Sequence, residues 1–551
     1  MKVSEAVGRA LAQWGVDRVF GVVGSGNFEV TTALVGAGAE YVAARHEGGA
    51  TTMADGYARI ARKVSVASVH QGPGLTNAMT GVAEASKAHT PLLIIAGETP
   101  ATMKTSNFWI EQSAAVEALG AVAFRLESPE TALADAARAF VAARSGQTVL
   151  LGLPLDVQAG EIDWPGSAPD LPELPTPPAP SAVAVSGLVA RLSSATRPVI
   201  VAGRGGFAAH DELVRLAAAS GALLATTAMA RGLFNDDPWT LDVMGGFSTA
   251  PVAELIQGAD LIVAFGASLN RWTTRNGELV GRTSVGQTPI VQVDIDHAAF
   301  ARHRRVAATV IGDAALVATA VADALEDAGE RVGYRTPEAA AALASGRRWR
   351  DLPFTPEKSD SRIDPRTLAI ALDDLLPTER IVTVDAGSHT EYTAMYLQVP
   401  DDHGYCLPLG FQCVGLALAA GIGAAVARPD RLPVIGVGDG GFMMSLVELD
   451  TAVRLGLPLV VIVYNDSAYG AEVHHFSHSG LSLDIVEFPD TDIAAIARGF
   501  RCTGVTVRSL DDLSAVHEWL DGERANPLVI DAKTISFPSW VDAHAFVGEP
   551  K

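Results

Sequence analysis

Asp439 lies at the carboxyl end of one apolar, strand-like run, and Asn465 lies at the end of the next. Because the carboxyl ends of adjacent parallel strands meet at one edge of a sheet, both side chains could reach a single ion. A carboxylate, an amide oxygen and a nearby backbone carbonyl, for which we take that of Ser467, are hard ligands that suit Mg²⁺, with phosphate oxygens and water completing the octahedron. The pattern predicts a metal-anchored phosphate site.

Glycines flank Asp439 at Gly438, Gly440 and Gly441. They allow the backbone to approach a phosphate closely, and the helix expected after them adds the positive end of its dipole. The same stretch also matches GxGxxG, with Asp466 roughly where a ribose-binding acid would lie, so a dinucleotide-dependent dehydrogenase is an alternative. Asp439 would, however, face a dinucleotide pyrophosphate with like charge unless a cation intervened, which favours the metal–diphosphate interpretation.

The motif at Asp439 also carries a family resemblance. The Gly-Asp-Gly turn there, with Asn465 twenty-six positions after Asp439 and Tyr469-Gly470 close behind, resembles the thiamine diphosphate (ThDP) motif of the superfamily that contains acetolactate synthase and benzoylformate decarboxylase. The resemblance implies that Asp439, Asn465 and the Ser467 carbonyl hold Mg²⁺ beside the cofactor's diphosphate.

Two upstream segments resemble other cofactor-contacting parts of the same family. The segment DAGSH resembles the strand-end loop that contacts the diphosphate, which nominates Ser388 and His389. The segment GFQCVGLALAAGIGA resembles the one in which a bulky apolar side chain props ThDP into its bent shape; Val414 takes that position, where methionine, leucine or isoleucine is usual. Gln412 would offer its backbone carbonyl to the cofactor's amino group. The resemblance thus assigns cofactor contacts to Ser388, His389, Gln412, Val414, Gly438, Asp439, Gly440, Gly441, Asn465, Ser467, Tyr469 and Gly470.

The segment RHEGGATTMADGYAR, residues 45–59, closely resembles the RHE…A…MADGYAR pattern of this family. By that resemblance Glu47 is the carboxylate that hydrogen-bonds the aminopyrimidine ring of ThDP and, by stabilising its imino tautomer, makes an internal base beside the thiazolium C2–H. Taken alone, Glu47 would be a carboxylate favoured at a helix N-terminus. In this superfamily the glutamate and the diphosphate site come from different subunits, which implies a homodimer or homotetramer with active sites between subunits.

The segment VHQGPGLTNAM predicts a tight loop between a strand and a helix. His70 resembles the active-site histidine of benzoylformate decarboxylase and could relay protons, its ordinary pKa lying near neutrality; a strand-end histidine bonded to the backbone is the alternative. Ser25, in an upstream glycine-rich loop, occupies the position of a substrate-contacting serine there. Asn77 could cap or begin the following helix and is assigned to the cofactor.

Residues 107–112, NFWIEQ, resemble the FQEIDQ segment of the family. Gln112 matches that segment and is taken as catalytic. Phe108 replaces a glutamine that helps to shape the site in acetolactate synthases. This departure puts a straightforward acetolactate synthase in doubt.

Four ionisable residues, Glu472, His474, His475 and His478, follow the metal motif where the family has its substrate-side helix. Glu-x-His-His on a helix is not a complete transition-metal ligand set, so substrate lining or a solvated face is favoured. His474 is taken as a candidate proton carrier. Further upstream, the segment VIVAGRGG resembles the middle domain, which holds FAD in some members. Because the same turn serves plain packing, FAD binding is allowed but not favoured.

These resemblances imply an enzyme that forms or cleaves a carbon–carbon bond next to a carbonyl. The first hypothesis is decarboxylation of a 2-oxo acid with carboligation, as in acetolactate synthase, and the alternative is non-oxidative release of an aldehyde, as in benzoylformate decarboxylase. A diketone hydrolase stays open. A catalytically silent ThDP binder is disfavoured because it has no need of Glu47, Asp439 and Asn465 together.

Composition narrows the range of partners and compartments. The 551-residue chain carries a formal charge of −22, which argues against nucleic acid and anionic membranes as partners. Its cysteines, Cys406, Cys413 and Cys502, match neither a disulfide framework nor a zinc site, as expected in a reducing compartment. The N-terminus lacks a signal-peptide core, and the longest apolar stretches fall short of a membrane span. We expect a cytoplasmic enzyme acting on a small molecule.

The elements that must position these residues are strands alternating with alanine-rich helices, which predicts an α/β protein with mostly parallel sheets flanked by helices. A proline-rich tether over residues 159–182 and a polar stretch over 329–361 separate three domains, taken as 1–160 (pyrimidine-binding), 183–328 (middle) and 360–551 (diphosphate- and Mg²⁺-binding). The third domain resembles the first only in its general βα pattern. Strands are predicted at residues 19–23, 41–44, 64–70, 92–96, 148–153, 198–202, 261–265, 290–295, 381–385, 434–438, 459–465 and 528–530.

Overall fold

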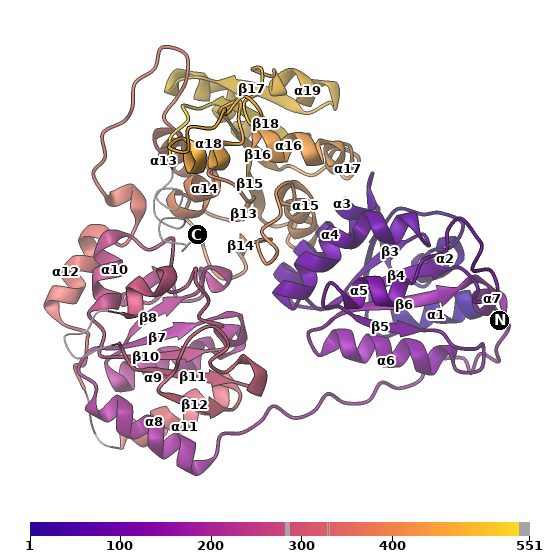
Figure 1. Cartoon of the computed structure of the whole chain (residues 1–551), viewed down its shortest axis with the longest axis horizontal. Coiled ribbons are helices and arrows are strands. Elements are labelled where there is room, and N and C mark those ends of the chain that lie inside the picture. Colours follow the sequence, from indigo (N-terminus) through magenta and orange to yellow (C-terminus); the bar gives the residue numbers. More distant parts are fainter. Residues whose placement is uncertain (282–286, 328, 330, 539–551) are drawn as a thin grey trace.

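The computed structural model describes all residues of the chain except 282–286, 328, 330 and 539–551. Within the described residues the chain forms three α/β units, each built on a six-stranded sheet whose paired strands run parallel (Figure 1). Fully buried strands rich in valine, isoleucine and leucine are typical of parallel sheets covered by helices on both faces. The predicted fold class is confirmed.

The first sheet has the strand order β2-β1-β3-β4-β6-β5. Its strands are β1 (Arg18–Gly21), β2 (Glu40–Ala43), β3 (Ser65–Val69), β4 (Leu92–Glu98), β5 (Val122–Arg125) and β6 (Thr148–Pro154). Its helices are α1 (Val3–Gln13), α2 (Phe28–Gly36), α3 (Glu47–Ala61), α4 (Pro73–Ala88), α5 (Gln112–Glu117), α6 (Ala132–Arg144) and α7 (Leu155–Ala159). The helical apolar spacing at the N-terminus forms α1, whose Val3, Val7 and Leu11 are buried in the core of this unit.

The middle sheet has the order β12-β11-β10-β7-β8-β9, the doubly wound order of dinucleotide-binding folds. Its strands are β7 (Pro198–Ala202), β8 (Leu223–Thr226), β9 (Thr240–Val243), β10 (Leu261–Phe265), β11 (Ile290–Asp294) and β12 (Ala308–Ile311). Its helices are α8 (Ala182–Ser194), α9 (His210–Ser220), α10 (Ala250–Gln257), α11 (Ala314–Glu326) and α12 (Pro337–Gly346).

The third sheet has the order β14-β13-β15-β16-β18-β17, which is the order of the first sheet strand for strand. Its strands are β13 (Arg380–Val384), β14 (Tyr405–Cys406), β15 (Leu432–Gly438), β16 (Val460–Asn465), β17 (Thr503–Val507) and β18 (Leu528–Lys533). Its helices are α13 (Pro365–Leu375), α14 (Thr390–Tyr396), α15 (Ala417–Ala427), α16 (Asp439–Ser445), α17 (Leu449–Arg454), α18 (Gly470–Phe476), α19 (Ile493–Gly499) and α20 (Ser514–Asp521). The two outer domains therefore share one topology, although the sequence reveals only a common βα pattern.

Ligands of doubly wound sheets bind where the strand order reverses, outside the carboxyl ends of the strands. In the first domain this point lies between β1 and β3, and the loops that follow these strands carry Ser25 and His70. In the third domain it lies between β13 and β15, which lead into Ser388 and Asp439. The topology thus places the predicted site residues of both domains at the expected binding crevices.

The first and third domains pack directly through α3 and α15, which cross at glycines. A Cβ on Gly56 would lie 2.2 Å from the carbonyl oxygen of Ala420, and one on Gly423 would lie 1.9 Å from the carbonyl oxygen of Met53. Glycine is required at both points because the two backbones touch. Side chains of both domains share one hydrophobic core around this crossing, so the start of α3 is fixed relative to the start of α15.

A buried ionic network reinforces the same interface. Arg59 on α3 pairs with Asp55 (2.8 Å) and Glu84 (2.7 Å), whose carboxylates are fully buried, and donates to the Leu407 carbonyl at 2.7 Å. Glu84 also accepts the backbone N–H of Gly410 at 2.8 Å. Charges in such a place are tolerated only when they are paired and hydrogen-bonded. The network anchors the loop that leads into α15.

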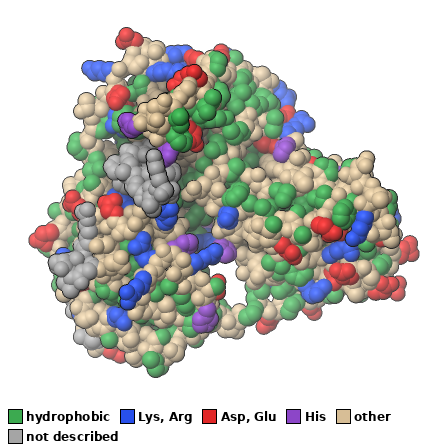
Figure 2. Space-filling view, in the orientation of Figure 1, with side chains coloured by type: hydrophobic (Ala, Val, Ile, Leu, Met, Phe, Trp, Pro, Cys, Tyr) green, Lys and Arg blue, Asp and Glu red, His purple; other side chains and the backbone are tan. Residues whose placement is uncertain are grey.

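The predicted tether is an extended connection between the first and middle domains. From residue 162 to residue 181 the chain has neither helix nor strand, and it runs along the lower edge of the view in Figure 1. Basic side chains are interspersed with acidic and apolar ones on the face shown in Figure 2. Among the described helices, none is both long and apolar enough to cross a bilayer.

Candidate active site

A cavity of about 180 Å³ lies at the carboxyl ends of β13, β15 and β16. It collects predicted cofactor residues from four separate segments of the third domain. Those lining it are Ser388, His389, Val414, Gly438, Asp439, Gly440, Gly441, Tyr469 and Gly470. Glycine is needed where these segments meet: a Cβ on Gly470 would lie 2.6 Å from an Asp466 carboxylate oxygen and 2.8 Å from Ser388 Oγ.

Three carboxylates line this cavity, those of Asp439, Asp466 and Glu472, and the first two influence each other's charge. Burial and the neighbouring Asp466 raise the pKa of Asp439 to about 7, and burial also raises the pKa of Asp466. Two like charges held together in a partly desolvated place are costly unless a cation lies between them. The pair is therefore suited to a divalent ion with oxygen ligands.

Asn465 and Ser467 do not line the cavity, although both were predicted as metal ligands. The Asn465 side chain is 1% exposed, and its Nδ2 donates to Asp531 on β18 at 2.8 Å. Successive side chains at the end of a strand point to opposite sides, so Asp466 faces the cavity while Asn465 is turned toward the neighbouring strand. The Oγ of Ser467 accepts a hydrogen bond from Arg362 at 3.1 Å.

His389 presents a neutral imidazole to the cavity. Burial lowers its pKa to about 3, and its Nε2 has no hydrogen-bond partner among the described residues. Gly387 and Gly438 make room for the ring, since a Cβ on either would lie within 3 Å of a ring atom. A buried polar atom without a partner is uncommon, and a ligand oxygen in the cavity would satisfy it.

The Val414 loop is held over the cavity by Asp385, a residue that sequence reasoning did not single out. Its carboxylate accepts the backbone N–H groups of Gly415 (2.7 Å), Leu416 (3.1 Å) and Ala417 (3.4 Å), at the start of α15. Burial raises the pKa of Asp385 to about 6. The signal in the sequence that could have identified Asp385 is its position, because it is an acidic residue directly after a buried strand.

Gln412 lies outside the cavity lining. It is exposed, and its φ of 57° places it in the left-handed region. Val414, two residues later, keeps its side chain 37% exposed. The loop thus presents an apolar side chain that the fold leaves without full cover.

Glu47 is the first residue of α3 in the first domain. The Nδ2 of Asn77 donates to one of its carboxylate oxygens at 3.0 Å, and a Cβ on Gly74 would lie 3.6 Å from the other. The structure therefore brings together Glu47, Asn77 and the loop after β3. One carboxylate oxygen is held by Asn77, and the other lies beside Gly74 in the loop after β3.

His70 borders the same crevice with a defined tautomer. The Gly26 backbone N–H donates to His70 Nδ1 at 3.1 Å, so in the neutral ring the proton resides on Nε2. Burial lowers the pKa of His70, while Glu47 acts in the opposite direction. The Phe108 ring meets the imidazole edge-on, with ring centroids 5.1 Å apart, and the exposed Ser25 lies on the loop next to Gly26.

Gln112 was predicted as catalytic, but its side chain is 4% exposed and fully engaged by the backbone. Its Oε1 accepts the Gly72 N–H at 2.9 Å, and its Nε2 donates to the Gly97 carbonyl at 3.0 Å. Both polar ends are committed, so Gln112 fixes the loop after His70 and does not reach the crevice. The prediction of a direct catalytic contact is wrong.

The ionisable side chains on α18 flank the third-domain cavity. Glu472 lines it, and the Nε2 of His474 is buried without a hydrogen-bond partner among the described residues. His474 lies close enough to Asp466 to oppose, in part, the rise that burial causes in the pKa of that carboxyl. No group of three or more His, Cys, Asp or Glu side chains suited to a metal occurs in the described part of the chain, so the histidines on α18 form no transition-metal site there.

The glycine loop after β7 packs against its neighbour in the middle domain. A Cβ on Gly203 would lie 2.2 Å from the Gly266 carbonyl, and the Trp272 ring covers Gly246 so closely that a Cβ there would lie 2.2 Å from it. Packing alone thus accounts for these glycines. FAD remains an option that the sequence does not favour.

The two sets of site residues face separate crevices of the single chain. The lining of the third-domain cavity contains no first-domain residue among those described, so Glu47 and His70 do not reach it within one chain. The first and third domains each supply one part of the predicted set of active-site residues.

Comparison with known proteins agrees with this arrangement. Residues 1–118 match the thiamine pyrophosphate enzyme N-terminal TPP binding domain, residues 185–321 the central domain, and residues 385–532 the C-terminal TPP binding domain; thiamine pyrophosphate is ThDP under another name. The chain is 30% identical to the acetolactate synthase large subunit of Parasynechococcus marenigrum, over 98% of this chain and 87% of that protein.

Two further relatives show the same relationship. The probable 2-ketoarginine decarboxylase AruI of Pseudomonas aeruginosa is 31% identical over 93% of this chain and 90% of its own length. The chloroplastic acetolactate synthase of Arabidopsis thaliana is 28% identical over 85% of this chain and 70% of its own length. With all three domain models matched in order and such relatives spanning nearly the whole chain, the protein belongs to the ThDP-dependent enzyme family.

Proposed function

We propose that this enzyme uses ThDP and Mg²⁺ to decarboxylate a 2-oxo acid and to join the remaining acyl unit to a second carbonyl compound. The observation that carries the proposal is the pair Asp439 and Asp466 facing one cavity beside the neutral His389. When bound, ThDP supplies the electron sink that a 2-oxo acid needs in order to lose CO₂. The name of the Parasynechococcus relative supports the carboligase assignment.

Mg²⁺ would be held by Asp439, Asp466 and the carbonyl oxygen of Ala468, all of which border the cavity. This set replaces the predicted Asn465 and Ser467 by their immediate neighbours. A dication would relieve the repulsion that raises the pKa of Asp439. His389 and Ser388 would contact the diphosphate, and Val414 would support the bend of the cofactor from its exposed position.

Glu47 would come to this cavity from a second copy of the chain. Glu47 lies near the reversal of strand order between β1 and β3, and the third-domain cavity lacks any first-domain wall among the described residues. A homodimer, or a tetramer built from two dimers, would complete two sites at once. The Glu47 carboxylate would then hold the proton relayed from the cofactor's aminopyrimidine ring.

His70 would act on the substrate, because its Nε2–H points away from the Gly26 N–H that holds Nδ1. A neutral donor of this kind can hydrogen-bond a substrate oxygen and stabilise the negative charge that develops on it. Phe108 beside it would give an apolar wall where acetolactate synthases have a polar side chain. We also propose a cytoplasmic location, in keeping with the three free cysteines.

Simple decarboxylation is the second candidate, favoured by His70 with Phe108 and by the name of the Pseudomonas relative. The two candidates are separated by product analysis with ThDP and Mg²⁺ over pyruvate, benzoylformate and longer 2-oxo acids. Release of 2-hydroxy ketones, or of 2-hydroxy-3-oxo acids when the acceptor is a second 2-oxo acid, supports the carboligase. Release of free aldehyde in a one-to-one ratio to CO₂, even with added acceptor carbonyls, would replace it by the decarboxylase.

Replacing Asp466 by alanine is expected to weaken Mg²⁺-dependent binding of ThDP at least about tenfold, because one of two metal-facing carboxylates is lost. The measurement is calorimetric titration of ThDP at a series of Mg²⁺ concentrations. Asp484→Ala, an exposed carboxylate on the same flank, serves as the control and should bind as the wild type does. Normal metal dependence in Asp466→Ala, with its loss in Asn465→Ala, would restore the original ligand assignment.

A second prediction concerns pH. His70 is effective when neutral, and burial lowers its pKa below the ordinary 6.5, so the acid limb of kcat/KM should lie below pH 6.5. As pH falls through that lowered pKa the ring gains a proton and activity declines. His70→Gln is expected to lower kcat/KM about 10²-fold and to remove this limb. An unchanged acid limb in the variant would show that another group titrates there.

A further inference from the structure

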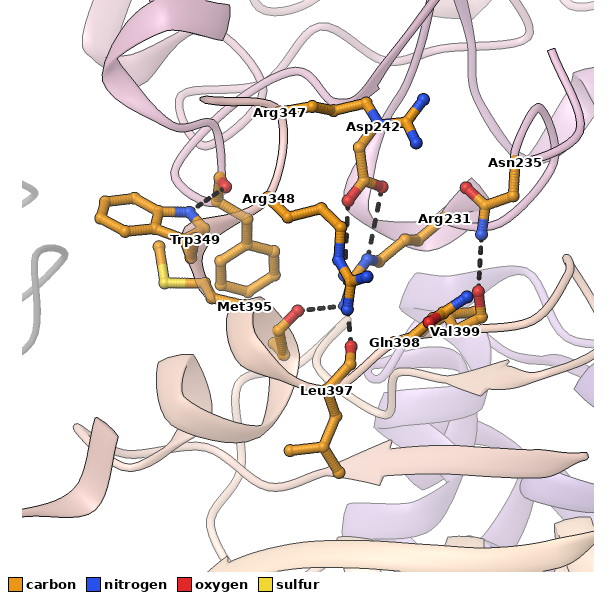
Figure 3. A pocket seen from close by; sticks show the side chains of 12 residues that line it. Arg231, Asn235, Asp242, Arg347, Arg348, Trp349, Met395, Leu397, Gln398 and Val399 are labelled. Carbon is orange, nitrogen blue, oxygen red and sulfur yellow. Dashed lines mark hydrogen bonds and ion pairs between the residues drawn. The ribbon is translucent and has the colours of Figure 1, made fainter. Parts of the chain in front are cut away.

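A second cavity, of about 90 Å³, lies between the middle and third domains, away from both halves of the active site (Figure 3). Three arginines line it: Arg231 from the middle domain, and Arg347 and Arg348 from the segment after α12. Its remaining lining is Asn235, Asp242, Phe247, Trp349, Ala394, Met395, Leu397, Gln398 and Val399. The volume exceeds the space that one water molecule requires.

Arg231 is buried, with 7% of its side chain exposed, and among the described residues it pairs with one carboxylate, that of Asp242. Its guanidinium lies 3.3 and 3.4 Å from the Asp242 oxygens, which is long for a charge-assisted pair. Its other donors reach the carbonyl oxygens of Ala394 and Leu397. Asp242 itself has a φ of 58°, in the left-handed region that aspartate and asparagine adopt more readily than most other residues.

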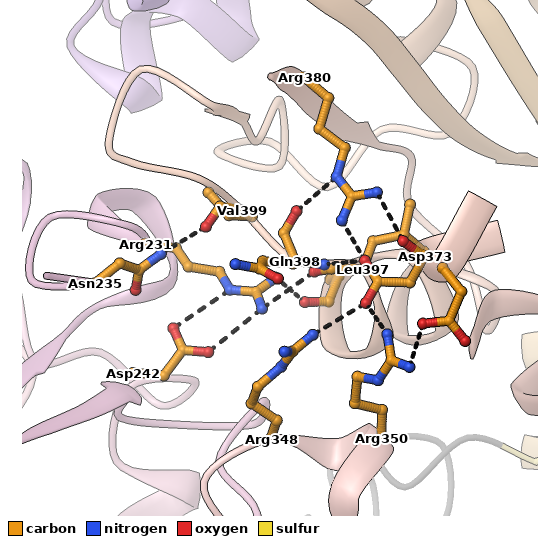
Figure 4. A network of polar contacts seen from close by, with 12 residues as sticks. Arg231, Asn235, Asp242, Arg348, Arg350, Asp373, Arg380, Leu397, Gln398 and Val399 are labelled. Atoms are coloured by element: carbon orange, nitrogen blue, oxygen red, sulfur yellow. Dashed lines mark hydrogen bonds and ion pairs between the residues drawn. The ribbon is translucent and has the colours of Figure 1, made fainter. Parts of the chain in front are cut away.

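Arg347 has no hydrogen bond or ion pair from its side chain to any residue that the structure describes, although it is half-buried and lines the cavity. The neighbouring arginines are already paired: Arg348, Arg350 and Arg380 converge on Asp373 (Figure 4). Arg350 also pairs with Asp374 at 2.5 Å.

The cavity and its network therefore carry surplus positive charge. Five arginines (Arg231, Arg347, Arg348, Arg350 and Arg380) face three aspartates (Asp242, Asp373 and Asp374). The surplus of positive charge at this cavity contrasts with the net charge of −22 of the whole chain. Withdrawing an arginine from water without a counter-charge is unfavourable, so an anion in the cavity would be stabilised.

We propose that this interdomain cavity binds a small oxyanion, a carboxylate or a phosphate, between Arg347 and Arg231. The guanidinium fork matches the paired oxygens of a carboxylate or a phosphate. Because the cavity is partly buried, dissolved salt screens the attraction between arginine and anion less than it would at the surface. The Trp349 indole closes one wall, its N–H held by the Phe247 carbonyl at 2.7 Å. Neither this ligand nor this site belongs to the proposed reaction.

The anion site is an effector site because α14 joins it to the cofactor cavity. Tyr392, on α14, lines the cofactor cavity, whereas Ala394 and Met395, at the other end of the helix, line the arginine cavity. The helix spans only about 10 Å. An anion that draws on Arg231 changes the bonds that hold the last turn of α14 and hence the placement of His389 at its start. This coupling, unlike the binding, rests on the proposed function.

The binding test is calorimetric titration of the wild type with sodium acetate and, separately, with inorganic phosphate, at constant ionic strength set with chloride. ThDP and Mg²⁺ are present at saturation to occupy the active site, and acetate has no ketone to react. Arg347→Met should weaken binding about tenfold, the loss expected for one charge-assisted hydrogen bond. Arg144→Met, an exposed arginine of the first domain, is the matched control and should bind as the wild type does.

Asp242→Asn gives an effect of opposite sign, which a misfolded variant could not produce. It removes the carboxylate that competes with the anion for Arg231, and asparagine tolerates the left-handed backbone, so binding should tighten. The anion that binds more tightly, acetate or phosphate, identifies the chemical class of the ligand as carboxylate or phosphate. No saturable binding to the wild type, or equal binding by Arg347→Met and the wild type, overturns the site.

The effector role is tested by titrating ThDP with and without the bound anion. By thermodynamic reciprocity, an anion coupled to the cofactor shifts the Kd of ThDP in the wild type and shifts it less in Arg347→Met. Anion binding that leaves the Kd of ThDP unchanged overturns the effector role. If ThDP itself does not bind, the proposed function fails while the anion site is still judged by its own titration.

Discussion

Replacing Glu47 by glutamine is expected to lower kcat about 10²- to 10⁴-fold while leaving Mg²⁺-dependent ThDP binding close to that of the wild type. The amide has nearly the shape of the carboxylate and can keep the contact with Asn77, which reaches Glu47 at 3.0 Å. It cannot carry the negative charge that the aminopyrimidine relay requires. The loss should therefore appear in kcat and leave cofactor binding intact.

Steady-state turnover and calorimetric ThDP binding, measured on the same preparation, check this prediction. Glu117→Gln is the matched control, because Glu117 is an exposed carboxylate of the same domain at the end of α5. Turnover of Glu47→Gln within a few-fold of the wild type would remove Glu47 from the chemistry. Loss of ThDP binding in this variant would instead make Glu47 a binding residue.

The second large effect is a recovery of activity. Asp439→Asn is expected to be nearly inactive, as Glu47→Gln is, because it removes a metal-facing carboxylate. When the two variants are co-expressed with different tags and assemble at random, about half of the dimers are mixed. In a mixed dimer one site carries both defects and the other carries none, so total activity should reach about a quarter of the wild type.

Recovery of this size follows only if Glu47 and Asp439 act across a subunit boundary. In the single chain the Asp439 cavity has no first-domain wall among the described residues, which is why complementation is expected. Isolation of the doubly tagged species should enrich the activity to about half of the wild type. Mixed dimers that are as inactive as the separate variants would place both residues of each site in one chain.

The central strands other than β8 could be predicted from the sequence because they are buried on both faces and consist of apolar runs. Strands β7 and β10 have the predicted bounds. The strands that escaped prediction are β5, β8, β9, β12, β14 and β17, and all except β8 are edge strands. The missed edge strands are short or mix apolar with polar residues: β14 has only two residues, and β17 has a single buried residue among its five.

Within the site, residue types were more predictable than orientations. The segment at the end of β16 was identified from Asn465 and its spacing from Asp439, but one position decides which side chain faces the cavity, because a strand alternates its faces. The position of Asp466 in the lining and the bond of Asn465 to Asp531 settle that orientation in the structure. Gln112 was misjudged for a related reason, since its backbone partners lie 15 and 40 residues away.

Family resemblance supplied what local patterns could not. Glu47 alone is an ordinary helix-start carboxylate, and only the surrounding segment gave it a role. The role of Asp385 in holding the Val414 loop required the three-dimensional contact, because its partners follow it by 30 to 32 residues. The shared topology of the outer domains likewise became visible only as a strand order.

The most direct measurement is CO₂ release by the purified wild-type chain from pyruvate, benzoylformate and longer 2-oxo acids, with and without ThDP and Mg²⁺. We predict release from at least one of these acids that depends on both additions and is lost in Glu47→Gln. Binding of ThDP without CO₂ release from any of them would contradict the proposed 2-oxo acid chemistry. Absence of ThDP binding, together with tight binding of a nicotinamide dinucleotide, would contradict the cofactor assignment and favour the GxGxxG interpretation of the turn at Asp439.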